Sequence, residues 1–154
     1  MLIEIKELRK TFENGTKALQ GVNLSVSEGE FVVILGASGS GKTTLLRSIN
    51  GLVEFEQGEI KFCNNIISSS TLPTLRKQTG MVFQDFNLVS NLSSLNNVLT
   101  GLLDSSNTIM SMLYLFTKEQ KKQALSCLEM VGLLDKAYSR VDKLSGGQQQ
   151  RVGI

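Results

Sequence analysis

The chain has 154 residues, which is enough for one domain with a buried core. Hydrophobic residues make up 41% and charged residues 19%, an ordinary globular composition. The formal charge of +2, from 16 Lys and Arg against 14 Asp and Glu, is too small to indicate a surface that attracts nucleic acid or anionic membrane. There is no histidine, which excludes a Ser-His-Asp triad, a histidine general base and histidine metal ligands from this chain.

Cysteine usage and the N-terminus point to a reducing compartment. Cys63 and Cys127 are far apart and form no C-x-x-C pair, so neither a disulfide framework nor a zinc site is expected. The sequence begins without a basic and apolar leader, and no apolar run approaches the roughly 20 residues that a membrane helix needs. We therefore expect a cytoplasmic protein.

The residue pattern of the first half of the chain predicts mainly strands. Apolar residues alternate over 2–8 and 19–26, which predicts two half-buried antiparallel strands, and a turn is expected at 27–30. Residues 31–35 are apolar at every position, which predicts a central strand covered on both faces. Leu45, Leu46 and Ile49 then have helical spacing, so a helix over 43–50 is expected to stop at Gly51.

The second half reads mainly as helices. Short strands are predicted at 59–62 and 81–83, and Pro73 can open a helical turn that ends near Gly80. Apolar spacing predicts an amphipathic helix over 94–103. Thr117 and Gln120 match a capping box for a further helix through Val131, with Gly132 as its stop.

One motif between the apolar run 31–35 and the first helix fits G-x-x-x-x-G-K-[ST], the pattern of a phosphate-binding loop. Glycines let backbone N–H groups surround a phosphate chain, and the following helix adds the positive end of its dipole. Lys42 would place its charge on the β and γ phosphates, and the Thr43 hydroxyl could bind Mg²⁺. The alternative is a merely flexible glycine turn. The motif consists of Gly36, Ala37, Ser38, Gly39, Ser40, Gly41, Lys42 and Thr43.

A second motif, Leu144-Ser145-Gly146-Gly147-Gln148, precedes a run that can form a helix. Ser145 can cap this helix, and the glycines leave backbone N–H groups open to an anion. Considered in isolation, the motif is better explained as an ordinary serine cap with loose glycines, because serine caps are common.

Together, the two motifs resemble those of the ATP-binding-cassette (ABC) ATPases, and the pentapeptide matches the family signature at every position. Gln84 stands where that family has its Q-loop glutamine, and Phe12 where it has the aromatic residue that stacks on adenine. Phe12 could instead be a core aromatic. The resemblance implies an α/β P-loop NTPase core with an antiparallel β subdomain and a helical subdomain, incomplete at the C-terminus. It divides the chain into 1–83 (β subdomain and core), 84–143 (helical subdomain) and 144–154 (signature and its helix).

The same resemblance implies roles for individual residues. ATP would be bound by Phe12 and by the loop from Gly36 through Thr44, with Mg²⁺ held by Thr43 and Gln84 and with Lys42 and Gln84 as the catalytic residues. The signature would contact ATP held by a second nucleotide-binding subunit, in a head-to-tail dimer, through Ser145, Gly146, Gly147 and Gln148.

The family also has elements that this sequence does not contain. These are a strand ending in an aspartate for Mg²⁺, a glutamate that activates water, and a switch histidine. Asp135 and Asp142 precede the signature and are interpreted as surface charges. We therefore expect the 154 residues alone to bind ATP without turnover, and to be poorly stable because residues 31–35 would expose a hydrophobic edge.

A finer resemblance, to the ATPase subunits of phosphonate importers, rests on segments 84–88, 97–101, 113–119 and 132–138. It implies transmembrane permease partners, an indirect partnership with a periplasmic or extracellular solute-binding protein, and a location on the cytoplasmic face of the membrane. Residues 88–103 are the candidate surface for docking on the permease. Residues 110–116 are interpreted as packing within the helical subdomain rather than as a membrane contact.

Two other functions are kept open. One is transport of another solute, such as an amino acid or a lipoprotein, by an importer or exporter of the same family. The other is a cassette ATPase that acts on nucleic acid or ribosomes, against which the near-neutral charge argues; no nucleic-acid partner is expected.

Overall fold

The computed structural model describes residues 1–102 and 116–154. The described chain forms two compact units, Met1–Met81 and Val82–Ile154. Residues 110–115 of segment 110–116 and residues 113–115 of segment 113–119 lie outside the described residues, as does the last residue of the predicted helix 94–103. Within the described ranges, no helix is both long enough and apolar enough to cross a membrane.

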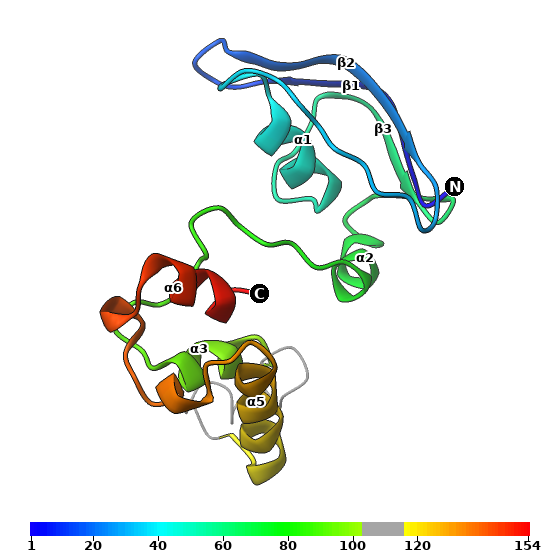
Figure 1. Ribbon diagram of the computed structural model, residues 1–154. Helices are drawn as coiled ribbons and strands as arrows, with labels where there is room; N and C mark the ends of the chain where they lie inside the picture. Colours follow the sequence, from blue (N-terminus) through cyan, green and yellow to red (C-terminus); the bar gives the residue numbers. More distant parts are fainter. Residues whose placement is uncertain (103–115) are drawn as a thin grey trace. The chain divides into compact units, whose positions relative to one another are not determined.

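The first unit is built on a four-stranded antiparallel sheet of order β2-β1-β3-β4 (Figure 1). Its strands are β1 (Ile3–Thr11), β2 (Lys17–Val26), β3 (Gln57–Phe62) and β4 (Asn65–Ile66). In β1, Ile5 pairs with Leu24 of β2 on one side and with Ile60 of β3 on the other. The alternating strands and their antiparallel contact are therefore confirmed, as is the strand predicted at 59–62.

Helix α1 (Lys42–Ile49) packs on this sheet and closes the core of the unit. Its inward residues Leu45 and Ile49 join the buried sheet residues Ile5, Leu8 and Ile60. The chain leaves the helix through Gly51, whose φ of +62° suits glycine, as the sequence predicted. This packing fixes the start of α1, and with it the end of the glycine-rich loop.

Helix α2 (Leu72–Gln78) begins at the proline turn that the sequence predicted. Arg76 attaches it to the end of α1, because its guanidinium donates to the carbonyl oxygens of Asn50 at 3.2 Å and Gly51 at 2.9 Å. Thr79 adds a hydrogen bond from its hydroxyl to the Asn50 side chain at 3.1 Å.

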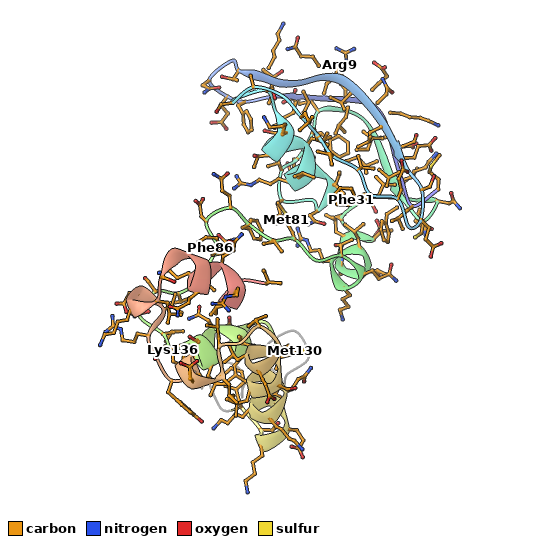
Figure 2. The ribbon with its side chains drawn as sticks, viewed as in Figure 1. Arg9, Phe31, Met81, Phe86, Met130 and Lys136 are labelled. Atoms are coloured by element: carbon orange, nitrogen blue, oxygen red, sulfur yellow. The ribbon has the colours of Figure 1, made fainter. Side chains whose placement is uncertain are left out.

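Two predicted strands are wrong. Residues 31–35 and 81–83 carry no strand pairing, and Phe31 and Leu35 are 91% and 87% exposed rather than covered on both faces. Hydrophobic side chains favour a strand only when neighbouring strands accept its backbone hydrogen bonds, and no described strand pairs with either segment. Figure 2 labels Phe31 on the stretch between β2 and α1.

The second unit is helical. It contains α3 (Ser94–Thr100), α5 (Lys118–Met130) and α6 (Gly146–Val152), with two 3₁₀ turns, η2 (Leu134–Lys136) and η3 (Val141–Lys143). Its buried core is drawn from all of these elements except η2, together with the loop residues beside them. The core consists of Leu95, Leu99, Ala124, Leu128, Leu133, Ala137, Val141, Leu144 and Val152.

The helix ends in this unit follow the local chemistry of the sequence. The Thr117 hydroxyl accepts from the Gln120 N–H at 3.2 Å and the Gln120 side chain accepts from the Thr117 N–H at 2.9 Å, which confirms the capping box. Helix α5 ends one residue before Val131, and Gly132 follows with φ +68°. Helix α3 is shorter than predicted, since it ends at Thr100 with Gly101 as its cap.

Candidate functional site

The glycine-rich loop is held in a shape that two of its glycines make possible. Gly39 and Gly41 have φ values of +80° and +87°. A Cβ atom at Gly41 would also lie 2.2 Å from the carbonyl oxygen of Ala18 in β2. The loop therefore turns tightly into α1 directly beside the sheet, and any side chain at Gly41 would displace it.

The ammonium group of Lys42, the first residue of α1, lies within this loop. Its ammonium donates to the carbonyl oxygens of Gly36 at 2.8 Å and Ala37 at 2.7 Å, and to the Ser40 hydroxyl at 3.2 Å. The loop is thus curled around a positive charge in a conformation that its own lysine stabilises. A phosphate chain entering the loop would meet this ammonium and the backbone N–H groups at the start of α1.

Helix α1 contributes a further positive potential. Its first turn contains no acidic residue, and its N-terminal N–H groups carry the positive end of the helix dipole. Thr43 is exposed in this first turn, so its hydroxyl oxygen is available to a hard cation such as Mg²⁺. A hollow of about 330 Å³ adjoins the loop, bounded on the sheet side by Leu19 and Gln20.

Phe12 lies in the β1-β2 hairpin turn and is 39% exposed, so it does not belong to the core. The turn is closed by hydrogen bonds from the Phe12 N–H to Thr16 and from the Gly15 N–H to Phe12, at 2.9 and 2.8 Å. The Lys10 ammonium lies 5.6 Å from the centre of the ring, and an open hollow of about 750 Å³ is lined in part by Lys10 and Phe12. The ring is therefore partly exposed, with the Lys10 ammonium over it.

Gln84 is exposed and begins a turn in the second unit. Two of the next residues, Phe86 and Asn87, have φ values of +56° and +48°, a conformation that costs a non-glycine residue of order 1–3 kcal/mol. Such a turn persists only where its surroundings hold it in place.

The signature residues lie at the start of α6. Ser145 accepts from the Gln148 N–H at 3.4 Å, and the Gln148 side chain accepts from the Ser145 N–H at 2.9 Å, so the two form a capping box. Gly146 and Gly147 are exposed, and apart from the flanking residues and the backbone of α6 itself, no atom in the described part of the chain would lie within 4 Å of a Cβ placed on either of them. The motif therefore presents open backbone to solvent, with Gln148 engaged in the cap.

The segment before this motif is held by Gln149, whose side-chain amide donates to the carbonyl oxygens of Val141 and Leu144, both at 3.1 Å. Arg151 attaches the same helix to the end of α5 through its hydrogen bond to the Val131 carbonyl oxygen at 2.9 Å.

The structure thus assembles the glycine-rich loop and Phe12 in the first unit, and Gln84 and the signature in the second. Among residues 1–102 and 116–154, no three His, Cys, Asp or Glu side chains gather as a metal site. The oxygen donors expected to hold Mg²⁺, on Thr43 and Gln84, are exposed, each in its own unit. This donor chemistry fits a hard cation that is bound mainly through a phosphate ligand.

Sequence reasoning missed one residue that shapes the second unit. Asn97 of α3 is 7% exposed and makes three side-chain hydrogen bonds to the segment that follows the Gln84 turn. An asparagine between Leu95 and Leu99, on the apolar face of a helix, is the signal that could have identified it, because a buried amide must find partners.

The family model described as ABC transporter matches residues 19–154. The phosphonates import ATP-binding protein PhnC of Lactobacillus gasseri is 47% identical over 99% of this chain, and that of Shouchella clausii is 49% identical over 99%. The chain spans 60% and 59% of the length of these two proteins.

Solved structures agree with this assignment. A dimeric structure of the ATP-binding cassette MJ0796 in a post-hydrolysis state, bound to ADP and Pi, matches 99% of this chain and 67% of its own at 38% identity, with a TM-score of 0.82. The cbiO1 protein of Clostridium perfringens, part of the ABC transporter complex cbiONQ, matches 99% of this chain and 59% of its own at 29% identity, with a TM-score of 0.75. The expected P-loop ATPase fold is confirmed, and the chain belongs to the ABC transporter family.

Proposed function

We propose that this chain provides the ATP-binding part of an ABC importer, which couples ATP binding and hydrolysis to the uptake of a solute of the phosphonate or phosphate-ester class. The observation that carries the proposal is the loop from Gly36 to Lys42, which is curled around one ammonium group at the start of α1. A phosphate chain is the ligand that such a loop recognises by charge and backbone hydrogen bonding.

In this proposal the site residues divide the binding of the phosphates, Mg²⁺, water and adenine among them. Lys42 binds the β and γ phosphates, and backbone N–H groups from Gly36 through Thr44 hold the rest of the phosphate chain. Mg²⁺, when bound, neutralises charge on the phosphate oxygens; the Thr43 hydroxyl and the Gln84 side chain would hold it. Gln84 would also orient water, and the ring of Phe12 would stack on the adenine base.

The signature gives the proposed second half of the site. Ser145, Gly146, Gly147 and Gln148 would contact ATP held by another nucleotide-binding subunit, with two chains arranged head to tail. Support comes from the open backbone at both glycines and from the dimeric state named for the similar cassette MJ0796. The Gln148 side chain accepts from the Ser145 N–H, so it would have to leave this capping box to reach a phosphate, whereas Gly146 and Gly147 are already exposed.

The proposed partners follow from the importer function. The chain would act at the cytoplasmic face of the membrane, with residues 88–103 docking on permease subunits and a solute-binding protein acting indirectly. The names of the two PhnC relatives support the phosphonate class. Another transported solute remains the second candidate, and the net charge of +2 argues against a cassette that works on nucleic acid.

The 154 residues by themselves are proposed to bind ATP without turnover, because they contain neither the aspartate-ended strand nor the glutamate that the family uses after the signature helix. The experiment is to measure ATP binding and phosphate release on the same preparation, with filter binding to RNA and DNA alongside. We expect ATP binding with neither phosphate release nor retention of nucleic acid. Phosphate release that disappears in Lys42→Ala would contradict the absence of turnover, and retention of RNA would favour the nucleic-acid cassette.

A further inference from the structure

One buried side chain holds the segment that follows the Gln84 turn. The Asn97 side-chain oxygen accepts from the Val89 N–H at 2.7 Å, and its amide nitrogen donates to the carbonyl oxygens of Val89 at 3.1 Å and Ser93 at 3.0 Å. The side chain thus pairs with both backbone groups of Val89, as a neighbouring strand would. Because Asn97 is 7% exposed, water is a poor substitute for these bonds.

The segment that Asn97 holds is in turn paired with the chain that leads to the signature. The Asp142 N–H donates to the Ser90 carbonyl oxygen and the Val141 N–H to the Leu92 carbonyl oxygen, both at 3.0 Å. Ser93 and Arg140 form an antiparallel bridge beside them. The turn η3 then runs directly into Ser145. A displacement of Val89 would therefore be passed to the start of α6 through backbone hydrogen bonds.

The far end of α6 also meets the Gln84 turn. A Cβ atom at Gly153 would lie 3.1 Å from the carbonyl oxygen of Phe86 and 3.3 Å from its Cβ atom, so the two backbones are in close contact. Figure 2 shows Phe86 beside α6. The positive φ values of Phe86 and Asn87 are thus maintained between Gly153 on one side and the Asn97 anchor at Val89 on the other.

We propose that Asn97 is a positioning residue, which fixes the turn that carries Gln84 to the signature helix α6 so that the two move as one body. Its side chain bonds to the backbone of Val89 and Ser93, so it would act through the position of that segment. The importance of this coupling rests on the proposed function of Gln84 and Ser145, whereas the coupling itself is a property of the second unit alone.

The test is residue-resolved amide hydrogen exchange on the 154-residue chain without nucleotide. In Asn97→Ala we expect the amides of Val89, Val141 and Asp142 to exchange about tenfold faster or more, while the amide of Leu128 stays protected. Val89 loses its hydrogen bond to Asn97, and Val141 and Asp142 are paired with the segment that Asn97 holds. The resonances of Phe86 and Asn87 should also shift. Asn96→Ala, one position earlier on the same helix, is the matched control and should leave all of these amides unchanged.

Unchanged exchange at Val89 in Asn97→Ala, or a change there that leaves Val141 and Asp142 protected, would overturn the proposal. If Asn97→Ala also loses protection at Leu128, the coupling is tested on the wild-type chain instead. In low denaturant its amides at Val89, Val141 and Asp142 should open with one common dependence on denaturant, and separate dependences would overturn the proposal. Because no nucleotide is used, either failure is distinguishable from a failure of ATP binding at Lys42.

Discussion

At the residue scale, the glycine-rich loop and the signature differ in the hydrogen bonds that their side chains already make. Lys42 is engaged with Gly36, Ala37 and Ser40, so its charge is positioned before any ligand arrives. Ser145 and Gln148 are engaged with each other in a cap. A ligand at the loop would therefore replace carbonyl oxygens as the partner of the Lys42 ammonium. A ligand at the signature would instead meet the capping box of Ser145 and Gln148 and two exposed glycines.

Ser48 of α1 gives a prediction about stability at this scale. Its hydroxyl is fully buried and finds no hydrogen-bond partner among residues 1–102 and 116–154. Removing an unsatisfied buried hydroxyl while keeping most of the volume should stabilise the chain, so we expect Ser48→Ala to raise the free energy of unfolding by about 1 kcal/mol. The measurement is denaturant unfolding, with the exposed Ser25→Ala as control. Destabilisation by Ser48→Ala would mean that the hydroxyl has a partner.

At the element scale, helix ends and the antiparallel contact of the first two strands can be predicted from the sequence, whereas contacts that depend on distant segments cannot. The capping box at Thr117 and the stops at Gly51 and Gly132 depend on residues within one turn, and all three are found. The strand predicted at 31–35 is wrong, because hydrophobic side chains do not determine which neighbouring strand accepts the backbone hydrogen bonds. Asn97 was missed for the same reason, since its partners at Val89 and Ser93 depend on a loop conformation that no local pattern encodes.

The bulge in β1 gives a prediction about pH. Glu7, with φ +47°, interrupts the strand register, and its carboxylate accepts from the Asn23 side chain at 2.7 Å. That hydrogen bond first, and the neighbouring Arg9 second, lower the pKa of Glu7 below its ordinary value. A lowered pKa contributes stability above the pKa of the unfolded chain, and this contribution is lost as the pH falls through the folded value.

We therefore expect an NMR titration to place the pKa of Glu7 below that of an ordinary glutamate, and Asn23→Ala to raise it. Asn14→Ala, in the adjacent hairpin turn, should leave this pKa unchanged. A Glu7 pKa that does not respond to Asn23→Ala would show that the hydrogen bond does not stabilise the charged form.

At the scale of the whole molecule, the chain is two small units, of which the first exposes an apolar segment. Phe31, Val33 and Leu35 are 91%, 60% and 87% exposed within five residues. An unpaired extended apolar segment is a site for association with other chains. We expect the chain to self-associate at micromolar concentration in size-exclusion chromatography with light scattering, and Phe31→Lys to shift it toward monomer.

The control for this prediction is Ser27→Lys, which adds the same charge nearby and leaves the apolar segment intact. It should associate as the wild type does. A monodisperse wild-type monomer with a sharp cooperative thermal transition would contradict the expectation that this segment makes the chain poorly stable.

The loop around Lys42 is proposed to bind ATP, which can be measured by equilibrium binding of ATP to the 154-residue chain. A charged hydrogen-bond partner is worth about 1.5–3 kcal/mol, so Lys42→Ala should weaken ATP binding by about tenfold or more. Lys122→Ala, which removes the same charge from an exposed position of α5 in the other unit, should bind ATP as the wild type does. Equal ATP affinity in the wild-type chain and Lys42→Ala, or no binding by either, would contradict the account.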